Sequence, residues 1–407
     1  MQDSEMSTPA IGTGEINAAE YFDPKSTTCG LAEAIAALPA RGGRVHLPAG
    51  TYVLRRSVYL PTGVSLVGEG AATVLTIRPL HQVLLARDCR RGGRSFVCHT
   101  RPPFALGDEV GLIDEEMRGW WGTHGIVEKI EDRRVHLNVP FNRQLKVERQ
   151  ARAVNLFPAI WSHQENDIEI RDLVVQGPVD YSGHWWNFTF AAIHLHDCQR
   201  VRVLNCTVHH WPSDGIGVQG GNDVQVAQCQ AHDCRGHGFH PGTNLGRSVW
   251  SHNIGRGNGG DGLFFCARVH RSICSDSVFS ENALNGIGGV ANGGDHHNII
   301  NANVCADNAL CGIDANRGEE QIISGNLVMN NSQAHPGTWP GIRLHDLERS
   351  IVQGNRCADD QETPTQKRGI IESGTSDYNL LSANLCVGMP EAVTLVGRHS
   401  RAEGNLV

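Results

Sequence analysis

DGIGVQG (214–220), HGFHPGT (237–243), DGLFFCA (261–267) and NGIGGVA (285–291) are versions of one motif in this 407-residue chain. Further copies are AAIHLHD (191–197), CGIDANR (311–317), PGIRLHD (340–346) and RGIIESG (368–374). From Gly215 to Gly369 the motif's glycine returns after 23, 24, 24, 26, 29 and 28 residues. A regular period of this length indicates a repeat architecture, in which each unit stacks on its neighbours.

The pattern inside each unit decides which repeat this is. Apolar residues alternate with period two, which favours strands and excludes the 3.6-residue stripe of a helical solenoid. A propeller blade usually needs about 40 residues, and the leucine-rich repeat has its own leucine pattern, which is absent here. Units of 23–29 residues with short strands broken by Gly, Asn or Asp therefore predict coils of a right-handed parallel β-helix, stacked about 4.8 Å apart.

A second landmark, late in each unit, predicts how the coils are held together. It carries an asparagine and often Cys or Val, as in NANVC (301–305), SGNLV (324–328) and SANLC (382–386). We expect the asparagines to form a ladder from coil to coil and the Cys and Val side chains to stack inside the cylinder. Because the 13 cysteines are odd in number and lack a CxxC motif, we interpret most of them as buried thiols rather than disulfides.

The N-terminal part carries a family resemblance. GLAEAIAALPARGG (30–43) predicts a helix, and RVHLPAGTYVL (44–54) and LPTGVSLVGEG (60–70) follow as strands. This order is similar to the start of pectate-lyase-superfamily proteins, in which a short helix caps the cylinder. The resemblance implies an all-β fold, a single-stranded right-handed parallel β-helix with an N-terminal capping helix. We expect a flexible tail over 1–19 and the β-helix over 20–407, with 76–160 as an irregular or inserted β-segment.

Charge and hydropathy exclude several classes of protein. The net charge of −8 argues against a nucleic-acid partner, and no apolar run is long enough for a membrane span. No signal peptide is visible, so we expect either a cytoplasmic protein or a secreted one without its leader. The chain ends within a coil at GNLV (404–407). An exposed coil end is prone to pairing, so a homo-oligomer covering it is one expectation.

Alternate positions of the repeated strand should face outward and predict a polar cleft for a chain-like ligand. Their members with binding chemistry, which we predict to contact substrate, are His194, His196, Asp314, Asn316, Arg343 and His345, together with Arg317 at the end of a strand. Arg268 also ends one of these strands, where it could hold a carboxylate. The other interpretation of this face is an ordinary solvated sheet.

The residue before each motif glycine forms another column, Asp214, His237 and Asp261. Coil stacking should place neighbours about 5 Å apart and the two aspartates about 10 Å apart. A histidine between two carboxylates suits acid–base chemistry. Asp-Gly and His-Gly turns explain the same residues without a function.

Two families resemble parts of this column. SDGI (213–216), GHG (236–238) and Arg268 are similar to motifs of polygalacturonase-type hydrolases, although the paired Asp of that family is missing. HGFHPG (237–242) is similar in frame to the YGxDPH-like segment of alginate C5-epimerases. His237, His240 and Gly242 stand where that family has Tyr, Asp and His.

These features lead to three hypotheses. The first is an enzyme acting on a uronate-containing polysaccharide by β-elimination or C5 epimerisation, with His237, His240, Asp214, Asp261 and Arg268 as catalytic candidates. Removing a proton next to a carboxylate needs a base, a cation at the carboxylate and an acid. The second is a glycoside hydrolase or fructan-type glycosyl transferase using the two aspartates. The third is a non-catalytic glycan-binding or tailspike-like module.

The segment VDYSGHWWNF (179–188) interrupts the repeat. We predict that its large polar and aromatic side chains stack on sugars, although they could also pack onto the cylinder. These residues are Tyr181, His184, Trp185 and Trp186. Asp214 and Asp314 could help to bind Ca²⁺, but no ligand-rich loop is present, so we assign no metal and no cofactor.

Overall fold

The computed structural model describes residues 9–117, 122–179 and 187–407. Contacts divide the chain into two compact units, which we treat separately. The N-terminal unit holds Ala10–Leu195 and Cys206–Gly217, and the C-terminal unit holds His196–Asn205 and Val218–Val407. Across the described residues, no helix has the length and apolar character needed to cross a bilayer.

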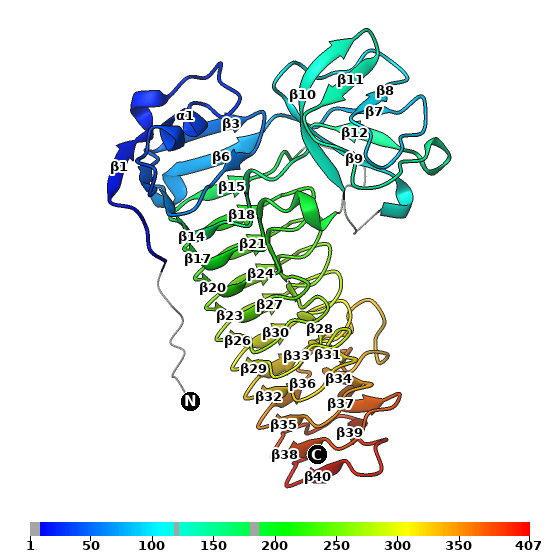
Figure 1. The fold of residues 1–407 in the computed structure, drawn as a ribbon. Coiled ribbons are helices and arrows are strands. Elements are labelled where there is room, and N and C mark those ends of the chain that lie inside the picture. Colours follow the sequence, from blue (N-terminus) through cyan, green and yellow to red (C-terminus); the bar gives the residue numbers. More distant parts are fainter. Residues whose placement is uncertain (1–8, 118–121, 180–186) are drawn as a thin grey trace. The chain divides into compact units, whose positions relative to one another are not determined.

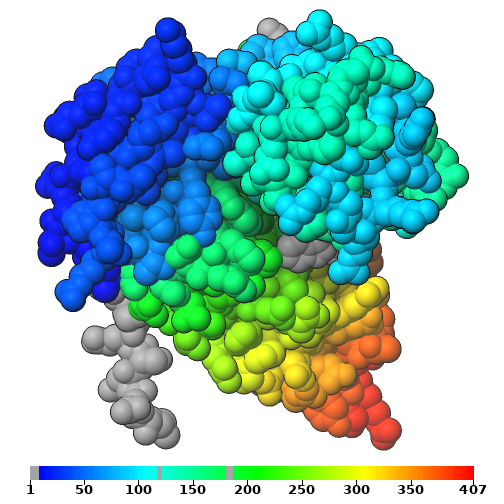
Figure 2. Space-filling model, turned by 45° about the horizontal axis from the view of Figure 1, so that its top comes forward, coloured from blue at the N-terminus to red at the C-terminus, as the bar shows by residue number. Residues whose placement is uncertain are grey.

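The C-terminal unit is built of parallel strands stacked coil upon coil, drawn as green to red arrows in Figure 1. The same part of the chain is green to red in the space-filling view of Figure 2. The strands form three long sheets. The first contains β17 (Gln199–Leu204), β20 (Asn222–Ala227), β23 (Gly246–Ser251), β26 (Ile273–Ser275), β29 (Ile299–Asn301), β32 (Ile322–Ser324), β35 (Ile351–Gln353), β38 (Leu380–Ser382) and β40 (Arg401–Glu403). The second contains β21 (Gln230–His232), β24 (Ile254–Arg256), β27 (Val278–Ser280), β30 (Val304–Ala306), β33 (Leu327–Met329) and β36 (Arg356–Ala358).

The third sheet is formed by the repeated motif itself. It contains β22 (Phe239–Pro241), β25 (Leu263–Phe264), β28 (Ile287–Val290), β31 (Ile313–Asn316), β34 (Ile342–His345), β37 (Arg368–Ser373) and β39 (Glu391–Thr394). Leu263 pairs with Ile287, Ile287 with Ile313, and Ile313 with Ile342. These side chains have no exposed surface, so the residue after each motif glycine points into the cylinder. The predicted parallel β-helix is therefore confirmed.

Buried asparagines tie one coil to the next, as the landmark predicted. The side-chain Nδ2 of Asn303 donates to Oδ1 of Asn326 at 3.1 Å, and Asn326 donates in the same way to Asn355 at 2.9 Å. Asn355 continues to Asn384, and Asn384 to Asn405. Each ladder bond satisfies a polar group that coil stacking would otherwise bury without a partner.

The N-terminal unit contains earlier coils of the same kind. One parallel sheet joins β1 (Gly14–Asn17), β2 (Gly43–His46), β5 (Val64–Val67) and β14 (Asn166–Arg171). Another joins β3 (Gly50–Leu54), β6 (Thr73–Ile77), β15 (Val174–Gln176) and β18 (Thr207–His209). β4 (Val58–Tyr59) pairs with β13 (Ile160–His163), and the short strands β16 (Ile193–His196) and β19 (Ile216–Gln219) follow along the chain.

Two details differ from the expectations for the N-terminus. The helix predicted over 30–43 is only α1 (Leu31–Ala36), because Pro39 and the left-handed Gly42 cannot continue it. The predicted tail, 1–19, overlaps β1, where Gly14–Asn17 pairs in parallel with Gly43–His46 and forms the first strand of the sheet. The other helical turns are η1 (Ala18–Tyr21), η2 (Gly70–Ala72), η3 (Glu115–Met117), η4 (Val147–Arg149) and η5 (Phe188–Phe190).

A six-stranded antiparallel sheet interrupts the coils between 82 and 154. Its order is β7 (Gln82–Leu84), β12 (Arg152–Val154), β9 (Glu109–Ile113), β10 (Thr123–Glu131), β11 (Arg134–Leu137) and β8 (Ser95–Val97). Phe96, Leu112 and Val135 belong to its own apolar core. The segment that the sequence marked as irregular therefore has an independent packing centre.

Candidate active site

His237 and Asp261 lie next to each other at the starts of consecutive coils of the C-terminal unit. His237 precedes β22, and Asp261 occupies the equivalent place one coil later. The backbone N–H of Asp261 donates to Nδ1 of His237 at 2.9 Å, and Oδ2 of Asp261 lies 3.2 Å from the same nitrogen. In the neutral ring, an accepting Nδ1 places the proton on Nε2.

The other side of the Asp261 carboxylate is held rigidly. Its Oδ1 accepts from the backbone N–H and from the side-chain Nδ2 of Asn285, both at 2.8 Å. Gly288 lies beside it, and a Cβ at that position would approach the carboxylate to 2.5 Å. Only 2% of Asp261 is exposed. These contacts indicate that Asp261 orients His237 and does not itself attack a substrate.

The imidazole rings of His237 and His240 both pack against the ring of Phe264. The His237 ring stacks on it with centroids 4.4 Å apart and planes 8° apart. His240 meets Phe264 edge-on at 5.3 Å, and the two histidine rings are 5.4 Å apart. His240 and Phe264 point outward because Phe239 and Phe265 point inward in the alternating strands. His237 and His240 are 2% and 5% exposed, whereas Phe264 and Cys266 are half-buried and form the accessible side of the cluster.

Cys266 is a member of this cluster that was not among the predicted site residues. Its Sγ lies 3.1 Å from Oγ1 of Thr243, and it is hydrogen-bonded to His240. Burial raises its pKa, but the hydrogen bond and charge of His240, together with Thr243, outweigh burial and lower the pKa to about 7. The outward alternate position in DGLFFCA was the signal that could have identified it.

Arg343 does not have the free guanidinium that we predicted for a substrate carboxylate. Its Nε and Nη2 donate to the two carboxylate oxygens of Asp314 at 2.6 and 2.7 Å. Trp339 covers it, with the guanidinium carbon 5.2 Å from the ring centroid. Burial raises the pKa of Asp314, and Arg343 opposes that rise. Because both oxygens of Asp314 face Arg343, this pair also conflicts with the suggested Ca²⁺ role of Asp314.

The remaining predicted residues of the C-terminal unit lie along the same outer edge. Asn316 is half-buried, and within the described chain its Oδ1 has no hydrogen-bond partner. His345 contacts Ser373 Oγ through Nδ1 at 3.0 Å. Arg268 and Arg317 are exposed, and Nε of Arg268 donates to Asn244 at 2.6 Å. The structure therefore brings together His237, His240 and Asp261, and it places Arg268 and Arg317 on the surface.

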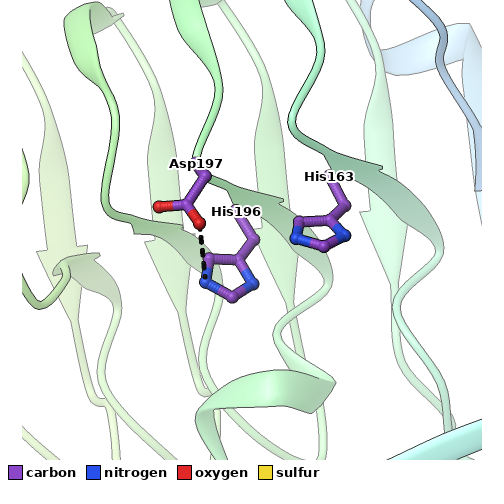
Figure 3. A group of neighbouring side chains, drawn as sticks. All are labelled: His163, His196 and Asp197. Carbon is purple, nitrogen blue, oxygen red and sulfur yellow. Dashed lines mark ion pairs between the residues drawn. The ribbon is translucent and has the colours of Figure 1, made fainter.

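His196 belongs to the first coil of the C-terminal unit. Its Nε2 lies 3.6 Å from Oδ2 of Asp197, the ion pair drawn as a dashed line in Figure 3. Figure 3 also labels His163, which comes from β13 of the N-terminal unit.

Two predicted residues belong to the N-terminal unit. His194 is 1% exposed and stacks on Trp161, with centroids 5.3 Å apart and planes 9° apart. The side chain of Asp214 is also fully buried, and its backbone carbonyl accepts from Ala192. His194 was predicted on an open polar face, but the outward position is covered here. The predicted sugar-stacking residues Tyr181, His184, Trp185 and Trp186 lie outside the described residues.

The N-terminal unit contains a further pair that the sequence did not reveal. Nδ1 of His124 contacts Oε1 of Glu109, and the backbone N–H of Ser57 donates to Glu109 at 2.7 Å. The His124 ring meets Trp161 edge-on, with centroids 5.1 Å apart. Burial opposes ionisation of Glu109, but His124 and Ser57 hold its pKa below the ordinary value. Glu109 and His124 lie in different strands of the antiparallel sheet, so no local motif marks the pair.

Comparisons with known proteins identify the same architecture. The family model described as right handed beta helix region matches residues 159–386. No curated protein matches the sequence. The A-module of the mannuronan C-5 epimerase AlgE4 of Azotobacter vinelandii is similar in structure, with a TM-score of 0.57 at 17% identity over 96% of this chain and 100% of that one.

Two other solved structures show the same likeness. A hyperthermoactive exopolygalacturonase from Thermotoga maritima has a TM-score of 0.57 at 12% identity, covering 98% of this chain and 93% of its own. The enzymatically active domain of tailspike protein 2 of bacteriophage CBA120 has a TM-score of 0.56 at 9% identity, covering 92% of this chain and 48% of its own. At these identities the likeness establishes the fold.

Proposed function

This chain belongs to the right-handed β-helix family of the pectate-lyase-like superfamily, and on that premise we propose that it is a carbohydrate-active enzyme. Its proposed substrate is an extended polysaccharide that contains uronate residues. The proposed chemistry is removal of the proton at C5, next to the carboxylate, followed by β-elimination or by epimerisation.

The observation that carries this proposal is the pair of imidazoles, His237 and His240, packed on Phe264 beside Asp261. Both reactions require two proton carriers close to one carbon atom. In elimination, a base takes the C5 proton, the C4–C5 double bond forms, and the oxygen on C4 leaves with a proton from an acid. In epimerisation, one group takes the C5 proton and another returns a proton to the opposite face.

The contacts suggest how the roles are divided. Neutral His237 carries its proton on Nε2, because Nδ1 accepts from the backbone N–H of Asp261. In this tautomer the Nε2–H of His237 can donate a hydrogen bond to the departing oxygen, with Asp261 orienting the ring; to transfer a proton to that oxygen, the ring must first gain one and become an imidazolium. His240 is then the candidate base. The substrate would approach from the side of Phe264 and Cys266, which are the half-buried members of the cluster.

The cation for the substrate carboxylate is assigned to the exposed arginines. Both Nε and Nη2 of Arg343 donate to Asp314, so we assign Arg343 a structural role rather than carboxylate binding. Arg268 and Arg317 keep exposed side chains at the strand ends. We therefore assign carboxylate binding to Arg268 or Arg317.

The test is a screen of the purified chain against pectate, alginate, other uronate polymers, neutral glucans and fructans. Ultraviolet absorbance of unsaturated ends and chemical reducing ends are measured in parallel, and C5 exchange in D₂O is followed by NMR. Absorbance rising with reducing ends supports elimination, and exchange without cleavage supports epimerisation. Reducing ends without absorbance would replace the proposal by a hydrolase, and polymer binding with no product would replace it by a binding module.

Variants connect the activity with the imidazole pair. His237→Gln and His240→Gln should each slow product formation by about 10²–10⁴-fold, the usual contribution of a positioned acid or base. His232→Gln, in β21 of the second sheet, is the matched control and should leave the rate unchanged. Equal losses in all three variants would contradict the assignment.

A further inference from the structure

The structure distinguishes one cysteine from the other twelve. All 13 cysteines lie among the described residues and all are free thiols. Twelve are buried, many of them stacked inside the coils, whereas Cys266 is half-buried. Cys266 continues the alternation of β25 just beyond the end of that strand: Leu263 and Phe265 are fully buried, whereas Phe264 and Cys266 are half-buried. In the folded protein, Cys266 is therefore the thiol that a dissolved reagent can reach.

The contacts of Cys266 favour its thiolate form. His240 is hydrogen-bonded to the thiol and can take its proton, and the hydroxyl of Thr243 lies 3.1 Å from Sγ. An imidazolium beside a sulfur atom stabilises the sulfur anion and makes it nucleophilic. Both partners come from the preceding coil: His240 lies in β22, and Thr243 lies in the turn that follows it.

A second, independent feature lies beside this contact. Gln219 is 4% exposed, and its Oε1 accepts from the backbone N–H of Thr243 at 3.0 Å. Among the described residues, its Nε2 has no hydrogen-bond partner. The amide fills the space over Gly242, where a Cβ would come within 2.1 Å of it. The buried amide of Gln219 is therefore bonded to the backbone of Thr243, the residue whose hydroxyl contacts Cys266, and it keeps one unused donor.

The other charged groups near the thiol do not oppose ionisation. Asp295 interacts electrostatically with Cys266, but burial raises the pKa of Asp295 to about 9, so this carboxyl is neutral at pH 7. Arg268 follows Cys266 by two residues and is exposed, with Nε bonded to Asn244. We therefore expect His240 to be the group that exchanges a proton with the thiol.

We propose that Cys266 is a nucleophilic modification site, activated by His240, that takes soft electrophiles such as a low-molecular-weight disulfide. With a disulfide, Sγ forms a bond to one sulfur, the original S–S bond breaks, and the departing sulfur takes the proton from His240. With iodoacetamide, an S–C bond forms and iodide leaves. Neither step requires a metal or a further co-reactant.

The site has a consequence for the imidazole pair. His240 touches both Cys266 and the His237–Phe264 stack. An adduct on Cys266 therefore occupies the accessible side of the cluster. It also removes the thiol proton that His240 would otherwise take. The loss of activity expected from this adduct rests on the proposed function, whereas the reactivity of the thiol does not.

The labelling experiment uses the full chain in its folded state. Iodoacetamide is added over a range of pH, and peptide mass spectrometry measures the rate at each cysteine. Cys266 should be alkylated first, with a midpoint near pH 7. In His240→Gln, if the thiol returns to an ordinary pKa of about 8.5, the thiolate fraction at pH 7 falls from about one half to about one thirtieth, so labelling slows about 15-fold.

Matched variants keep the result interpretable. Thr243→Val retains the side-chain shape and removes only the second hydrogen bond, so the midpoint should rise by less than in His240→Gln. His232→Gln should behave as the unchanged protein. Equal labelling of several cysteines, or a Cys266 rate that is the same in His240→Gln, would overturn the proposal. If the polysaccharide screen fails but Cys266 reacts as expected, only the proposed function is lost.

Discussion

The buried pair formed by Asp314 and Arg343 allows a stability prediction with a worked magnitude. The perturbation is Arg343→Met, which keeps an unbranched apolar stem and removes the guanidinium. Two charge-assisted hydrogen bonds of 2.6 and 2.7 Å disappear, and the Asp314 side chain, 11% exposed, is left without its cation. Breaking a buried ion pair from one side costs about 3–5 kcal/mol, because the remaining charge is uncompensated.

The penalty should depend on pH. Burial already raises the pKa of Asp314 against the opposing effect of Arg343, so removing Arg343 raises it further. A carboxyl whose pKa is higher in the folded state binds its proton more tightly there. Its protonation therefore favours folding at low pH, and that contribution is lost as the pH rises through the folded pKa. The deficit of Arg343→Met should be smaller near pH 4 than at pH 7.

The assay is urea unfolding followed by circular dichroism at both pH values. Arg247→Met is the matched control, because Arg247 holds Asp223 with the same two-bond geometry, at 2.8 and 3.1 Å, but is 43% exposed. It should cost at most about 1 kcal/mol. Equal costs for the two variants, or a deficit in Arg343→Met that grows toward pH 4, would refute the reasoning about burial.

Three further changes test the ladders, the site and the last coil. Asn308→Ala removes the acceptor of the Asn282 backbone N–H and the donor to the Phe279 carbonyl, so it should lower the free energy of unfolding by about 2–6 kcal/mol. The control, Asn301→Ala at an exposed position, should lower it by at most about 0.5 kcal/mol. Gly288→Ala should slow any C5 chemistry, because the new Cβ would lie 2.5 Å from the Asp261 carboxylate and displace the group that orients His237. An unchanged rate in the polysaccharide assay would contradict this. Glu372→Ala leaves four donors without their acceptor and should raise hydrogen exchange of backbone amides after 372 only, a pattern that uniform exchange along the coils would exclude.

Much of the fold could be predicted because coil stacking repeats one environment many times. Ile287, Ile313 and Ile342 occur at the same place in successive motifs, and a single column of the cylinder accounts for all three. The asparagine ladder and the internal thiols follow from the same regularity, since a buried polar group must find a partner in the adjacent coil. The proximity of His237 and Asp261 was predictable for this reason too.

The sequence by itself therefore determined the coil, its inward columns and the neighbours along each column. Only the tertiary structure decided which atoms of those neighbours meet: Arg343 meets Asp314 rather than a substrate, and Cys266 meets His240. It also decided that outward positions such as His194 are covered, and that Glu109 meets His124 across an antiparallel sheet. The physical reason is that a periodic sequence reports the stacking of backbones, whereas hydrogen bonds and burial depend on side-chain directions and on packing between coils.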